Sequence, residues 1–281
     1  VGRTIKKWWP VFVLPTFAAF VIGFLWPFIW GIYLSFCKFT TVQDVTFVGF
    51  SNYSKILLDS TFSHSFWLTV VFAFVSSILI NVLAFFIALA LTKGYRGTNA
   101  FRTVFFMPNL IGGIVLGYIW QTLLNGLLSK WGQPLLSLSA KNGFIGMLIL
   151  LMWQQIGYMM IIYIAGLQSI PGDVVEAAQI DGASRIQRLF KVTIPMMMPS
   201  ITICMFLSIT NGFKLFDQNL SLTAGEPSKM SEMMALNIFN TFYGRTGWEG
   251  VGQAKAVIFF VIVVAIGMLQ LRATRSKEVQ Q

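Results

Sequence analysis

The chain has 281 residues and a mass of 31.5 kDa; 56% of its residues are hydrophobic, only 11% are charged, and its mean hydropathy is +0.72. A soluble domain carries about a quarter charged residues, so this composition excludes soluble enzymes and nucleic-acid-binding domains and indicates an integral membrane protein. The net charge of +10 fits this class, because basic residues gather at the cytoplasmic ends of membrane spans. Cys37, Cys204 and the single His64 do not have the spacing of a metal site.

Six stretches lack Asp, Glu, Lys and Arg and predict six transmembrane helices, because a bilayer core of about 30 Å needs roughly 20 apolar residues. The first stretch is too long for a cleavable signal sequence, whose apolar part has about 7 to 15 residues. The last is slightly short, and we expect the flanking Lys255 and Arg272 to snorkel to the headgroups. We predict one all-α, polytopic membrane domain over residues 1–281, with spans at about 11–37, 66–92, 103–125, 143–167, 200–222 and 254–271.

The basic residues predict the orientation of these spans. Placing both termini in the cytoplasm puts twelve of the twenty basic residues but only four of the ten acidic residues on the inner side. Since cytoplasmic loops carry an excess of lysine and arginine, we expect both termini and the connection between the fourth and fifth spans to be cytoplasmic.

That connection, residues 168–199, is much longer than a helix hairpin needs, and we call it the elbow. Its sequence predicts two short helices. Gly182 can take the left-handed conformation that ends the first helix. Ser184 can cap the second, which we expect to run to about Val192 and to be stopped by Pro195.

The elbow also contains the pattern E-A-A-x-x-D-G-A followed by two spaced prolines, in residues Glu176, Ala177, Ala178, Asp181, Gly182, Ala183, Ile194, Pro195 and Pro199. This pattern resembles the EAA loop of binding-protein-dependent ABC import permeases. The resemblance implies the type I importer permease fold and a coupling helix that sits in a cleft on a cytoplasmic ATPase subunit. It assigns this coupling role to Glu176, Ala177, Ala178, Asp181, Gly182, Ala183 and Pro195. The alternative is an amphipathic surface hairpin without a partner.

Three further segments extend the resemblance over nearly the whole chain: FVGFSNY at 47–53, RTVFFMP at 102–108 and GFKLFDQNLSLTAGEP at 212–227. They are similar to segments of carbohydrate-uptake permeases of the maltose and glycerol-3-phosphate type, and more to the F-like of the two subunits. Two departures matter. Glu226 stands where glycine is usual, and a large external insert is absent, so docking of a binding protein is expected to use short loops such as 225–253.

The resemblance implies a heteromeric complex in a bacterial or archaeal plasma membrane. Its other parts would be a second homologous permease subunit, two ATPase subunits and an extracytoplasmic substrate-binding protein. The chain has no G-x-x-x-x-G-K-[ST] motif, so we expect ATP and magnesium to be bound by the ATPase subunits. The chain itself is expected to be no enzyme and to hold no cofactor or metal.

A sugar pathway needs amides, hydroxyls and aromatic faces within an apolar wall. The predicted spans offer eight candidates: Asn81, Trp153, Gln154, Gln155, Tyr158, Asn211, Lys214 and Asp217. The amides can equally be interhelical hydrogen-bonding groups worth about 0.6 kcal/mol each. Lys214 and Asp217 can form a structural pair on one helix face, and Gly113 with Gly117 predicts close helix packing.

The function predicted from these features is a permease subunit that forms half of the translocation pathway of an ATP-driven sugar or oligosaccharide importer. One alternative is an ABC import permease for amino acids, polyamines or anions, against which the polar but weakly charged path argues. The other is a secondary transporter, which usually needs ionisable residues deep in the bundle.

Overall fold

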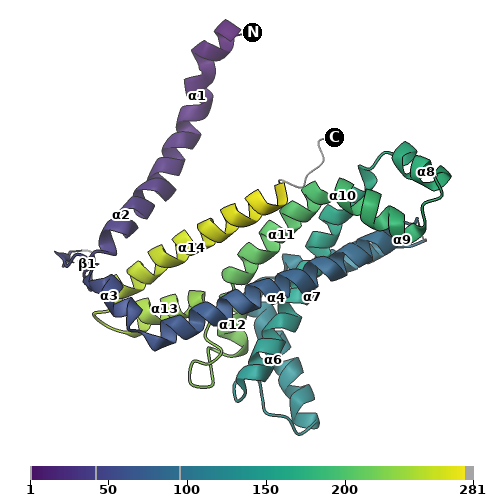
Figure 1. Ribbon diagram of the computed structural model, residues 1–281. Helices are drawn as coiled ribbons and strands as arrows, with labels where there is room; N and C mark the ends of the chain where they lie inside the picture. The colour runs from purple at the N-terminus through teal and green to yellow at the C-terminus, as the bar shows by residue number, and fades with distance from the viewer. Residues whose placement is uncertain (1, 42, 95, 276–281) are drawn as a thin grey trace. The chain divides into compact units, whose positions relative to one another are not determined.

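The computed structural model describes residues 2–41, 43–94 and 96–275. The chain forms two compact units (Figure 1). The small unit holds Val1–Ser60 and Ile238–Val261, and the large unit holds Thr61–Asn237 and Ile262–Gln281.

The helices within the described residues agree with the predicted membrane fold. Four are long and apolar enough to cross a membrane: Trp8–Leu34, Ser60–Leu91, Ala140–Gln168 and Glu249–Thr274. Two pairs of shorter helices meet the same criterion together but are bent, by 102° between Thr98–Leu110 and Gly113–Lys130 and by 70° between Arg185–Met196 and Met198–Phe213. Counting each bent pair as one span gives six spans, and the all-α polytopic class is confirmed.

The small unit begins with one long apolar helix and continues into a short loop region with two strands and a helix. Asn52 in α3 holds this fold together, because its side-chain nitrogen donates to the carbonyls of Ser35 and Cys37, both at 2.9 Å. The elements are α1 (Gly2–Phe20), the π-helical η1 (Val21–Leu25), α2 (Trp26–Leu34), the antiparallel strands β1 (Cys37–Lys38) and β2 (Thr46–Phe47), α3 (Ser51–Leu57), and the parts of α13 (Met234–Gly244) and α14 (Glu249–Arg275) that lie in 238–261.

Lys255 of α14 does not behave as the sequence predicts. Its side chain is 0% exposed, and its ammonium lies 2.8 Å from a carboxylate oxygen of Asp59, which is 11% exposed. The ammonium also donates to the hydroxyl of Thr241 at 2.9 Å. The expectation that Lys255 snorkels to the headgroups is therefore wrong, because an internal carboxylate satisfies its charge.

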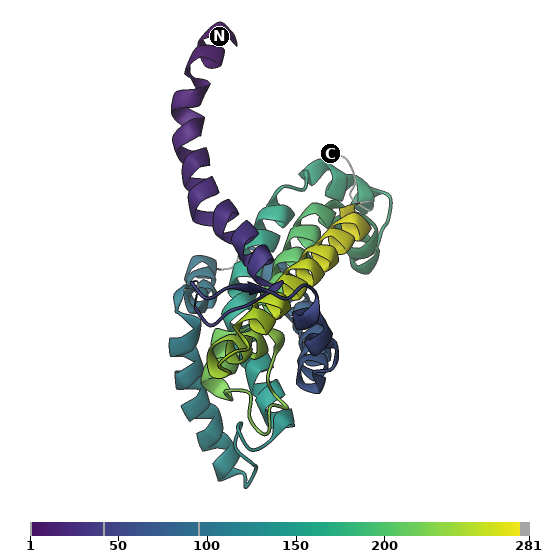
Figure 2. The same cartoon turned by 90° about the vertical axis from the view of Figure 1, so that its left-hand side faces the viewer.

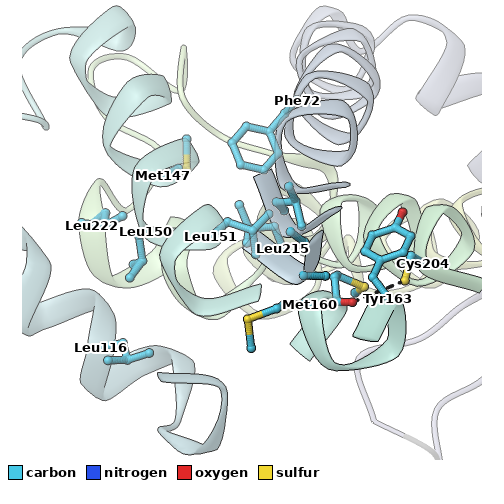
Figure 3. Packing of buried hydrophobic residues seen from close by; sticks show 14 of the residues in the cluster. Phe72, Leu116, Met147, Leu150, Leu151, Met160, Tyr163, Cys204, Leu215 and Leu222 are labelled. Atoms are coloured by element: carbon cyan, nitrogen blue, oxygen red, sulfur yellow. Dashed lines mark hydrogen bonds between the residues drawn. The ribbon is translucent and has the colours of Figure 1, made fainter. Parts of the chain in front are cut away.

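The large unit packs its helices around one hydrophobic core. Figure 3 shows Phe72 of α4, Leu151 of α7 and Leu215 gathered near the centre of this core, with Tyr163 and Cys204 to one side. The elements are α4 (Ser60–Leu91), α5 (Thr98–Phe106), the 3-10 helix η2 (Met107–Leu110), α6 (Gly113–Lys130), α7 (Ala140–Gln168), α8 (Gly172–Ile180), α9 (Arg185–Arg188), the π-helical η3 (Leu189–Thr193), α10 (Ile194–Met196), α11 (Met198–Phe213), α12 (Asp217–Leu222), and the parts of α13 and α14 outside 238–261.

The third predicted span, 103–125, is not one straight helix. Helix α5 runs into η2, the backbone is extended at Ile111 and Gly112, and α6 leaves at 102° (Figure 2). Pro108 fits the first turn of η2, and the glycines at 112 and 113 lower the cost of ending one helix and starting another. We refer to this bend as the corner.

The fifth predicted span, 200–222, is interrupted as well. Helix α11 ends at Phe213, and α12 begins at Asp217. Lys214 is exposed and Asp217 half-buried, and they lie on either side of this break rather than on one helix face. The predicted pair between them is therefore wrong.

Glycines let these broken helices approach one another closely. A Cβ added to Gly113 would lie 2.7 Å from the Cβ of Asp217, and one added to Gly117 would overlap the side chain of Ser221. A Cβ added to Gly157 of α7 would overlap the backbone carbonyl of Phe105 in α5. The close packing predicted from Gly113 and Gly117 is confirmed, and its partner is α12.

Candidate functional site

The elbow folds as a capped pair of short helices. Helix α8 ends at Ile180, and Gly182, two residues later, has a φ of +79°, the left-handed value expected for this glycine. The amide of Gly182 donates to the carbonyl of Gln179 at 3.1 Å, and the amide of Ala183 donates to that of Ala178 at 3.0 Å. These bonds satisfy carbonyls that the helix end would leave unpaired.

Ser184 begins the second helix with a capping box. Its hydroxyl accepts from the amide of Gln187 at 3.3 Å, and the Gln187 side chain accepts from the amide of Ser184 at 2.8 Å. Arg188 then donates to the side chain of Gln179 at 2.8 Å, which ties the second helix to the first. The predicted cap is confirmed, and the elbow has a defined shape.

Pro195 does not stop the second helix. The helical chain continues from α9 through η3 and α10 to Met196, and the 70° bend follows at Met197. Pro195 lies in the first turn of α10, and Pro199 lies in the first turn of α11. The continuous helix accommodates Pro195 directly after the π-helical η3, and the prediction that Pro195 ends the helix is wrong.

The surface of the elbow carries both charge and exposed hydrophobic side chains. Among the coupling candidates, Glu176, Ala177, Asp181 and Gly182 are exposed, whereas Ala178, Ala183 and Pro195 are half-buried. Ile180 and Ile186 are 86% and 71% exposed. Figure 1 shows α8 and α9 projecting together at one end of the large unit. Exposed apolar groups rimmed by charges are typical of a protein interaction site.

Inside the large unit, two of the candidate amides join α7 to the helices after it. Gln154 is buried, accepts from the side-chain nitrogen of Gln218 at 2.7 Å and donates to the carbonyl of Ile111 at 3.2 Å. Gln155 is half-buried and accepts from Asn211 of α11 at 3.0 Å. Gln154 therefore caps a carbonyl at the corner, and Gln155 holds α11.

Asn81 lies in a separate network between α4, α7 and α11. Its amide nitrogen donates to the carbonyl of Ser77 and the hydroxyl of Ser208, both at 2.8 Å, and its oxygen accepts from Tyr163 at 2.6 Å. Both amide hydrogens are thus used within the protein. Sequence reasoning missed Ser77, Tyr163, Ser208 and Gln218, although each is a polar side chain within or beside a predicted span.

The remaining candidates keep polar or aromatic surface available. Trp153 is 41% exposed, and its ring lies 5.3 Å from that of Trp120. Tyr158 is half-buried with its ring 6.5 Å from that of Phe106, and Lys214 is exposed. The structure therefore brings Gln155 and Asn211 together but does not gather all eight candidates in one place. The described residues contain no group of three or more His, Cys, Asp or Glu arranged to hold a metal ion.

Comparisons with known proteins agree with this architecture. The family model of the binding-protein-dependent transport system inner membrane component matches residues 80–276. The chain is 40% identical to AmyD of Thermoanaerobacterium thermosulfurigenes, a probable starch degradation products transport system permease protein, over 97% of this chain and 96% of that one.

Two solved structures share the fold. One is a bacterial ABC transporter involved in the import of the acidic polysaccharide alginate, with a TM-score of 0.82, 20% identity and 98% of both chains covered. The other is a bacterial alginate ABC transporter in complex with an alginate pentasaccharide-bound periplasmic protein, with a TM-score of 0.80, 20% identity and 98% and 97% covered. With the family model matching most of the chain, this chain belongs to the family of binding-protein-dependent transport system inner membrane components.

Proposed function

We propose that the chain is the transmembrane permease subunit of an ATP-driven importer and forms half of the translocation pathway for a sugar or oligosaccharide. The relative whose name refers to starch degradation products and the two alginate transporters support a saccharide cargo. The interior supports it too, because half-buried groups such as Gln155, Tyr158 and Asn211 are suited to hydroxyl-rich solutes.

The proposed assembly has four further components. A second homologous permease subunit completes the pathway, two ATPase subunits bind ATP and magnesium in the cytoplasm, and an extracytoplasmic binding protein delivers the sugar. The solved complex with a periplasmic protein is consistent with this arrangement. Both termini and the elbow face the cytoplasm of a bacterial or archaeal cell, in line with the excess of basic residues on that side.

The elbow is the proposed mechanical link to the ATPase. The observation that carries this proposal is a hairpin whose turn and cap are internally bonded at Gly182 and Ser184 while Glu176 and Ile180 remain exposed. A stiff hairpin with exposed apolar groups can transmit a displacement only if a partner holds it. Glu176 would add a charge-assisted contact to a basic group of that partner, worth about 1.5–3 kcal/mol.

The test is the double variant Glu176→Ala and Gly182→Pro in the full complex with its binding protein, reconstituted in lipid vesicles. Proline cannot adopt the φ of +79° that the turn needs, and the alanine removes the charge. We expect sugar-stimulated ATP hydrolysis and uptake to be lost, or the ATPase subunits to dissociate during purification. Amino acids and polyamines should not stimulate ATP hydrolysis.

The matched control is Asp44→Ala with Gly132→Pro. Asp44 is also an exposed acid, and Gly132 has a φ of +64° with an amide that donates to a helix-end carbonyl at 3.1 Å, like that of Gly182. Both control positions lie in loops assigned to the other side of the membrane. Sugar-stimulated ATPase activity that survives the elbow variant as well as it survives the control would refute the coupling role.

A further inference from the structure

A groove of about 270 Å³ lies on the large unit between α4 and the C-terminal part of the elbow, residues 189–194. Three of its lining residues, Val82, Phe85 and Phe86, come from α4, and three others, Leu189, Phe190 and Ile194, come from η3 and α10. Val82, Phe86 and Phe190 are 47%, 58% and 62% exposed, so the groove opens on the surface of the large unit.

The polar residues in the wall of the groove offer little to a hydrophilic ligand. Asn81 and Tyr163 line the groove, but both amide hydrogens of Asn81 and the hydroxyl hydrogen of Tyr163 are already donated within the protein. A sugar placed here would exchange its water for a wall without free donors, which is unfavourable. A hydrocarbon chain loses nothing by the same exchange.

An exposed lysine adjoins a groove residue in the sequence. Lys191 is exposed and follows the groove residue Phe190 directly in η3, which also holds the groove residue Leu189. Within the described residues, the side chain of Lys191 forms no ion pair or hydrogen bond, whereas that of the nearby Arg188 donates to Gln179. An apolar groove with an exposed lysine on the residue that follows its wall matches an anionic amphiphile, with its chain in the groove and its headgroup at the lysine.

We propose that the groove binds an acyl chain of an anionic phospholipid of the inner leaflet, whose phosphate is held by Lys191. The location in the inner leaflet rests on the proposed orientation of the elbow. Because one lipid would touch both α4 and η3, it would stabilise the packing of the C-terminal part of the elbow against α4. Coupling between ATP hydrolysis and transport would then depend on the anionic lipid content of the membrane.

The test uses the intact complex in nanodiscs of phosphatidylcholine with increasing phosphatidylglycerol. Trp in place of Phe86 serves as a reporter. Because the chain already has nine tryptophans, the signal is the quenching by brominated phosphatidylglycerol or brominated phosphatidylcholine that the Phe86→Trp complex shows beyond the complex with Phe86, and this difference measures which lipid occupies the groove. We expect phosphatidylglycerol to be preferred about fivefold, and Lys191→Gln to abolish this preference. Lys141→Gln, which removes an exposed lysine from the opposite end of α7, is the control and should leave the preference unchanged.

A second variant, Val82→Phe, narrows the groove without adding a tryptophan and leaves Lys191 in place. It should reduce the quenching of the reporter by both lipids. Equal quenching by the two lipids in the parent complex, or a preference that survives Lys191→Gln, would overturn the proposal. So would a cysteine at position 82 that cross-links to the second permease, because a protein would then cover the groove. In each case the elbow variant described above still tests the transport function separately.

Discussion

The buried ion pair of the small unit makes the sharpest stability prediction. Replacing Lys255 by Met keeps most of the side-chain volume but leaves the Asp59 carboxylate without the ammonium that lies 2.8 Å away. Removing one partner of a buried pair costs about 3–5 kcal/mol, because the other charge remains buried and uncompensated. Asp59 keeps 11% exposure, so we expect a value near the lower end, about 3 kcal/mol.

Thermal unfolding of the detergent-solubilised chain, followed by tryptophan fluorescence, measures this loss. At about 2–4 °C per kcal/mol for a chain of this size, Lys255→Met should lower Tm by roughly 6–12 °C. Adding Asp59→Leu should restore most of the loss, since an apolar pair replaces an ionic pair at little cost. Lys141→Met, at an exposed lysine, should change stability by less than about 0.5 kcal/mol. If Lys255→Met unfolds at the same temperature as Lys141→Met, the pair does not stabilise the fold.

Two further predictions concern the large unit. Gly117→Val should destabilise it by about 1–3 kcal/mol, because the new side chain overlaps Ser221 of α12, whereas Gly126→Val on the same helix meets open space; equal Tm values for the two variants would contradict this packing. Gln154→Leu should cost about 1–3 kcal/mol by stranding Gln218 and the Ile111 carbonyl, and a double-mutant cycle with Gln218→Leu should show coupling; additive losses would mean that the 2.7 Å contact carries no energy.

Features that depend on local chemistry were predictable from the sequence. The turn at Gly182 and the cap at Ser184 each follow from what one residue does to the backbone beside it, and the structure confirms both. The apolar stretches predicted the spans because the length that a helix needs to cross the bilayer does not depend on which helices lie beside it.

Features that depend on tertiary partners were not predictable in this way. Hydropathy does not report the direction of the chain, so the breaks at Gly112 and Lys214 were missed, although Pro108 and the glycine pair at 112–113 were a visible signal. The position of Lys255 beside Asp59 joins residues far apart in sequence. Whether Asn81 binds a solute or another helix likewise depended on Ser208, which sequence spacing cannot place.

The corner between η2 and α6 has a mechanical consequence for the transport cycle. The carbonyl of Ile111 at the corner accepts a hydrogen bond from the side chain of Gln154 in α7. The carbonyl of Phe105 in α5 lies close to Gly157 of the same helix α7. Turning α7 about its axis by itself would break the hydrogen bond to the half-buried carbonyl of Ile111 and drive Gly157 against the main chain of α5. These two attachments favour movement of α5, the corner and α7 as one body, which would place a hinge of this half of the pathway outside them.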